Sequence, residues 1–137
     1  MDKSIRTFQI ELAGTKLTCA EIDGVKLCNT TPHPATFGDE SGVYGSVPTS
    51  GLVVSATSQA TPAGEFGGAS LQRTSFMGNS ESEAILKALK AEGIIAFGSI
   101  IAMNAYPGLV YGLVPVKGFE RVPPAEKRMQ VKLFNIA

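Results

Sequence analysis

The chain has 137 residues, with 12 basic and 12 acidic side chains and a formal net charge of zero. This length predicts one domain, residues 1–137, that can bury a core without disulfides or metals. The balanced charge argues against a protein that binds nucleic acid or anionic membranes. Charged residues make up 18% of the chain, against about 25% in an average globular protein. Such a surface is typical of a subunit in an assembly, or of a β-protein rich in Ser and Thr.

The N-terminal residues 1–6 are mostly polar or charged and lead into an alternating strand, so we expect no secretory signal sequence there. The longest uncharged apolar run, residues 93–105, is too short for a membrane-spanning helix, which needs about 20 residues. We therefore expect a protein made in the cytoplasm, with no membrane partner.

The first strands are predicted from alternation and from turn chemistry. Thr7–Leu12 alternates apolar and polar residues, which is typical of a half-buried strand, and Lys16–Glu21 is expected to pair with it. Asp23-Gly24 favours a two-residue hairpin turn, in which both residues take a positive φ. That turn places Glu21 opposite Lys26 on the next strand.

The same register places the only two cysteines, Cys19 and Cys28, opposite each other. One interpretation is a cross-strand disulfide, since the Cα separation of such a pair is at the lower edge of the disulfide range. The other is a pair of reduced, buried thiols. The absence of an export signal favours the reduced pair.

The middle of the chain is rich in Gly and Pro and predicts loops at residues 29–50 and 59–68. A short strand is expected at Tyr44 and Val47, and further strands at 52–57 and 69–76. The glycines of the second loop do not form a phosphate-binding motif. His33, the sole histidine, has no nucleophile or orienting partner suggested by the sequence, which argues against a catalytic role.

One helix is predicted, at Ser80–Glu92. Ser80 and Glu83 have the spacing of a capping box, and a single apolar stripe contains Ile85, Leu86 and Leu89. Strands are expected to follow at 94–103, 109–119 and 128–136. The strand at 94–103 is uncharged and does not alternate, so we expect both of its faces to be covered, one by the helix and the other by a second sheet or a neighbouring subunit.

These elements predict a mainly β fold. We expect a small β-barrel or tight sandwich of six to eight antiparallel strands, with the helix at about 80–92 packed outside.

The C-terminal half, roughly residues 70–137, resembles the tube-forming proteins of phage tails, contractile injection systems and type VI secretion systems. The resemblance lies in the order of elements: the helix with Ile85, Leu86 and Leu89, an apolar strand, the turn Tyr106-Pro107-Gly108, then Val110–Val116 with Phe119, and a terminal strand. It implies a small β-barrel with one outer helix that forms six-fold rings, and rings that stack into a hollow tube within a virion or injection system.

The sequence therefore favours a non-enzymatic structural protein that self-assembles and also contacts other virion or injection-system proteins. We expect no catalytic residue, cofactor or metal site. The residues that we expect at subunit contacts are apolar, aromatic or loop positions: Pro32, His33, Phe37, Tyr44, Phe66, Ile95, Phe97 and Ile101.

Two alternatives remain open beside a plain β-domain without an assembly role. One is a capsid decoration protein, which would form compact oligomers. The other is a small ligand-binding or enzymatic β-barrel, with a pocket near His33, Asp39, Glu40 and Tyr44.

Overall fold

The computed structural model describes residues 4–124 and 126–137, so residues 1–3 of the predicted polar N-terminus lie outside it. The fold is mainly β, as predicted, but instead of the expected six to eight strands and one helix the described chain contains ten strands and two helices. In chain order these are β1 (Arg6–Leu12), β2 (Thr15–Ile22), β3 (Val25–Asn29), β4 (Ala35–Asp39), β5 (Gly42–Val47), β6 (Thr57–Phe66), β7 (Ala69–Met77), α1 (Ser80–Ala91), β8 (Ile94–Phe97), α2 (Ile100–Ala105), β9 (Gly112–Pro115) and β10 (Met129–Asn135).

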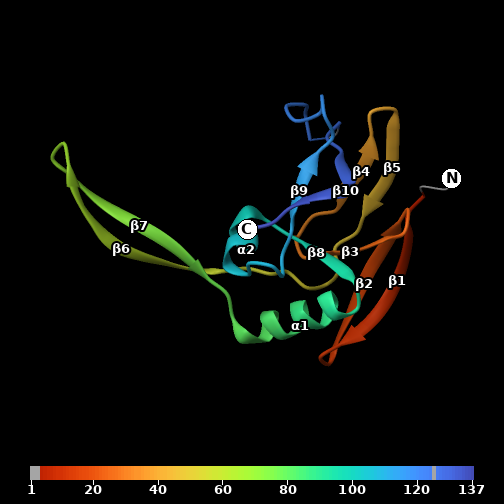
Figure 1. Ribbon diagram of the computed structural model, residues 1–137, viewed down its shortest axis with the longest axis horizontal. Coiled ribbons are helices and arrows are strands. Elements are labelled where there is room, and N and C mark those ends of the chain that lie inside the picture. Colours follow the sequence, from red (N-terminus) through yellow and green to blue (C-terminus); the bar gives the residue numbers. More distant parts are fainter. Residues whose placement is uncertain (1–3, 125) are drawn as a thin grey trace.

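The body of the molecule is a sandwich of two four-stranded sheets (Figure 1). The first sheet has the strand order β1-β2-β3-β8 and the second the order β5-β4-β10-β9. Neither sheet closes into a barrel within the described residues, so the sandwich is the correct one of the two predicted architectures. Two pairings are parallel, β3 with β8 and β10 with β4, where only antiparallel pairs were predicted.

The β2–β3 hairpin confirms the predicted turn. Asp23 has a φ of 50° and Gly24 a φ of 82°, the values that a two-residue type I′ turn needs. Glu21 lies opposite Lys26 in the resulting register. Local turn chemistry alone therefore fixes which side chains of these strands face the core.

The segment 29–50 is more ordered than the predicted loop. It contains the β4–β5 hairpin, which is held to the body because Phe37 and Val47 are fully buried. Pro32 and Pro34 precede the first strand of this hairpin, where they interrupt no ladder. The predicted strand at 52–57, in contrast, has no regular secondary structure up to residue 56.

Strand β8 is covered on both faces from within the chain. Ile94 and Ala96 pack in one core cluster with the buried α1 residues Ile85, Leu86 and Leu89. Phe97 packs in the other cluster, with Phe37 of the second sheet. The predicted apolar helix face is thus part of the core, and the second cover of this strand is a sheet of the same chain.

Two details of the helical region differ from the predictions. The N-cap of α1 is Asn79 rather than Ser80, and its side-chain oxygen accepts a hydrogen bond from the Ser82 backbone N–H at 2.7 Å. The predicted strand at 94–103 ends at Phe97 and is followed by α2, which Ser99 caps through a 3.1 Å bond from the Ala102 N–H. An apolar run of this length is compatible with either strand or helix, and the cap decides between them.

One of the two C-terminal strands is shorter than predicted. Only β9, residues 112–115, forms within the predicted strand 109–119. β10 reproduces the predicted terminal strand 128–136 to within one residue at each end.

Candidate assembly surface

The feature that stands out from the body is a long hairpin formed by β6 and β7, here called the arm (Figure 1). Every residue of β6 is exposed, and in β7 only Phe76 is half-buried. The sequence predicted a loop at 59–68, which is wrong. The missed signal is Gly67-Gly68, whose positive φ values of 63° and 81° close a two-residue hairpin turn between Phe66 and Ala69.

The arm is poorly suited to stand alone in solvent. A single two-stranded hairpin is at best marginally stable in water, and each of its outer edges presents unpaired N–H and C=O groups. Its only charged residues are Glu65 and Arg73, so it lacks the charges that usually protect exposed strands. Large apolar side chains are also exposed on it: Phe66 (78% exposed), Met77 (57%) and Leu71 (45%).

A buried tyrosine holds both ends of the arm. The Tyr106 hydroxyl, just after α2, accepts a hydrogen bond from the Asn79 backbone N–H at 2.8 Å and donates one to the Ser55 carbonyl at 3.4 Å. Ser55 lies just before β6 and Asn79 just after β7. Gly78 packs so closely on the ring that an added Cβ would lie 2.4 Å from two of its atoms. These contacts fix the position from which the arm leaves the body.

The eight predicted contact residues lie in different environments. Pro32 and His33 are exposed, as is Phe66 at the tip of the arm, and Ile101 on α2 is 46% exposed. The other four are less accessible: Tyr44 and Ile95 are half-buried, and Phe37 and Phe97 are fully buried with their rings 5.6 Å apart at 72°.

The burial of Phe37 and Phe97 corrects the prediction for these two residues. They pack in the intrachain core and present no surface to a second subunit. Aromatic residues in a short strand are compatible with either a core or an interface, and only the sheet pairing decides.

Cys19 and Cys28 are fully buried free thiols on adjacent strands. Their strands separate there, because Ser50 lies between them: its carbonyl accepts from the Thr18 N–H and its N–H donates to the Asn29 carbonyl, both at 3.0 Å. Hydrogen bonding to Cys28, together with burial, raises the pKa of the Cys19 thiol above its ordinary value. Among the described residues no group of three or more His, Cys, Asp or Glu could hold a metal ion.

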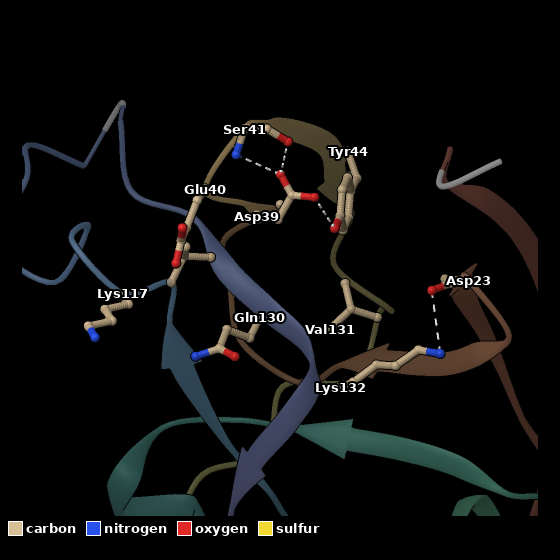
Figure 2. A pocket seen from close by; sticks show the side chains of 11 residues that line it. Asp23, Asp39, Glu40, Ser41, Tyr44, Lys117, Gln130, Val131 and Lys132 are labelled. Atoms are coloured by element: carbon tan, nitrogen blue, oxygen red, sulfur yellow. Dashed lines mark hydrogen bonds and ion pairs between the residues drawn. The ribbon is translucent and has the colours of Figure 1, made fainter. Parts of the chain in front are cut away.

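The predicted ligand site is only partly assembled. Asp39, Glu40 and Tyr44 line one open groove of about 550 Å³, shown in Figure 2, whereas His33 lies at a separate pocket. The groove has both signs of charge, including an ion pair of 3.4 Å between Lys132 and Asp23.

The Asp39 carboxylate accepts hydrogen bonds from residues of its own hairpin, β4–β5. It accepts hydrogen bonds from the Ser41 hydroxyl (2.6 Å), the Tyr44 hydroxyl (2.7 Å) and the Ser41 backbone N–H (2.8 Å). These donors stabilise the charged form and hold the pKa of Asp39 well below its ordinary value. A carboxylate in this state is a weak base, and its role here is to fix the β4–β5 turn.

In the described part of the chain, neither helix has the length and apolar character needed to cross a bilayer. Comparison of the chain with models of protein families, with curated proteins and with solved structures gave no match.

Proposed function

We propose that this chain is a non-enzymatic structural protein that self-assembles into rings or a tube, as a component of a virion tail or an injection system. The observation that carries the proposal is the arm, residues 57–77, whose edges and apolar side chains are exposed. Burying such a hairpin against another subunit would satisfy its backbone groups and remove apolar surface from water.

The arm is also held in one place. Tyr106 binds both of its ends, so the hairpin leaves the body at a fixed position. A fixed arm loses less conformational entropy on docking than a mobile loop does. The resemblance of residues 70–137 to tube-forming proteins supports the same function and suggests six-fold rings.

The low charge of the chain is consistent with this function, since charged residues are depleted at the centres of subunit interfaces. In this proposal the partners are further copies of the chain, together with other virion or injection-system proteins. The protein would then be located in the assembled particle after synthesis in the cytoplasm.

Light scattering after size-exclusion chromatography, combined with negative-stain microscopy of the wild-type protein, tests the proposal. We expect oligomers with a ring or tube outline. A compact oligomer without rings would favour the decoration protein instead. A monomer at the highest concentration that the protein reaches would refute self-assembly.

A further inference from the structure

The tip of the arm combines an acid with the most exposed large apolar side chain of the described chain. Phe66 is 78% exposed and directly follows Glu65, the only acid of the arm. The register of the hairpin shifts between Pro62 and Glu65, which marks an irregularity just before the tip. Such irregularities change the direction in which the following side chains point. The tip therefore presents an aromatic ring with a negative charge beside it.

This tip lies far from the body of its own chain. The ten residues of β6 span roughly 30 Å at about 3.3 Å per residue. Figure 1 shows the hairpin pointing away from both sheets, with its tip at the far end of the molecule. Since Tyr106 holds the base, a surface that receives Phe66 has to belong to another molecule.

The body contains a pocket of about 260 Å³ with matching chemistry, here called the His33 pocket. Leu113, Met129 and Pro34 supply apolar walls, and the buried Phe97 lies against it. His33 and Lys127 also line it, and none of its lining residues is an acid. A phenyl ring fits the size and apolar character of this pocket, and Lys127 supplies a positive charge to the lining that a carboxylate beside the ring can pair with.

The larger groove in Figure 2 matches the tip less well. Three acids, Asp23, Asp39 and Glu40, are among the residues that line it. Lys117 and Lys132 also line this groove, so the formal net charge of its lining is −1, whereas the lining of the His33 pocket has Lys127 and no acid and would attract the Glu65 carboxylate. Charge complementarity thus selects the smaller pocket.

We propose that Phe66 of one copy inserts into the His33 pocket of a second copy, with Glu65 paired to Lys127. This inference rests on the proposed self-assembly and identifies its contact. The tip and the pocket are different surfaces, so the contact is head-to-tail. Head-to-tail contacts build rings when the rotation closes and filaments when it does not, whereas a two-fold dimer needs a self-complementary surface.

Sedimentation velocity of charge variants tests the pairing. Glu65→Lys and Lys127→Glu should each weaken association, by about tenfold, and the double variant should recover most of the loss. Lys117→Glu, a charge reversal at the larger groove, is the matched control and should leave association unchanged. If the wild type assembles but the double variant shows no recovery, the pairing is wrong while self-assembly stands.

Phe66→Ala tests the insertion itself, because a buried aromatic anchor contributes strongly to association. We expect association to weaken by about thirtyfold, while Met77→Ala at the base of the arm has a much smaller effect. Circular dichroism confirms that each variant is folded. Unchanged association of Phe66→Ala would overturn the inference alone, whereas a monomeric wild type would overturn the proposed function as well.

A cross-linking experiment gives an independent readout. Ala69→Cys protein, whose new thiol lies opposite Phe66 at the tip and leaves its ring in place, is mixed with Thr36→Cys protein, whose new thiol lies at the His33 pocket, and the mixture is treated with a short bis-maleimide. We expect a covalent heterodimer. A mixture of Ala69→Cys with Lys117→Cys should give none, and the native cysteines add little background because both are fully buried. Equal cross-linking at the His33 pocket and at the larger groove would contradict the assignment of the His33 pocket as the site that receives Phe66.

Discussion

The hydroxyl of Tyr106 lies 2.8 Å from the backbone nitrogen of Asn79, a residue 27 positions earlier in the chain. Asn79 is the N-cap of α1 and lies two residues after the end of the arm, so this one bond joins α2, α1 and the arm. Tyr106 is 3% exposed and also packs in the core cluster that contains buried residues of α1. The direction of the arm is therefore tied to the hydrophobic core.

Replacing Tyr106 by Phe removes both hydrogen bonds of this hydroxyl and keeps the ring. We expect the free energy of unfolding to fall by about 1–2 kcal/mol, because the Asn79 N–H loses its partner. Urea denaturation measures the change, and hydrogen exchange should show faster exchange of the Asn79 amide. Tyr111→Phe is the control, since the Tyr111 hydroxyl makes no hydrogen bond within the described residues, and it should change stability by less than about 0.5 kcal/mol.

Gly78→Ala introduces a methyl group where no space exists. The new Cβ would lie 2.4 Å from two atoms of the Tyr106 ring, so the ring or the backbone has to move. We expect a loss of about 1–3 kcal/mol in thermal or urea unfolding. Gly42→Ala is the matched substitution, because a Cβ there meets nothing within 4 Å. Equal effects of the two substitutions would show that the close packing at Gly78 has no energetic consequence.

The depressed pKa of Asp39 predicts an acid dependence of stability. The carboxylate binds its proton less readily in the folded state than in the unfolded state, where the ordinary pKa is about 3.9. Its contribution to stability is therefore complete above that value and is lost as the pH falls toward the folded pKa. Asp39→Asn should be less stable than the wild type at pH 7, and the difference should shrink at about pH 3. A difference that is constant between these pH values would contradict the role of the charge.

Local chemistry in the sequence predicted the parts of the fold that depend on neighbouring residues. The turn at Asp23-Gly24 and the apolar face of α1 needed only residues close in sequence, and both were predicted correctly. The prediction of a single strand at 94–103 is wrong, because uncharged apolar residues are compatible with both strand and helix. The helix start is marked only by the cap at Ser99. The fold class followed from the alternating strands, whereas the partition into two sheets depends on long-range pairing.

The arm and its anchor were missed for a different reason. The Gly and Pro residues of 59–68 are typical of a loop, although Pro is tolerated in an exposed edge strand and Gly67-Gly68 favours a hairpin turn. The sequence predicts only a turn at Tyr106, and no local pattern connects this residue to Asn79. Among the predicted contacts, Phe66 lies at the arm tip and His33 at the proposed receiving pocket, on opposite sides of the contact that we infer.

Shortening the arm tests the central claim most directly. Residues 60–74 are replaced by Asn-Gly, which joins the paired residues Gln59 and Ser75 through a two-residue turn and leaves Tyr106 and its partners in place. The arm adds no buried residue to either core cluster, so the variant should fold with nearly unchanged thermal stability. Analytical ultracentrifugation at matched concentrations should then show oligomers for the wild type and a folded monomer for the variant. A shortened protein that assembles as well as the wild type would contradict the account.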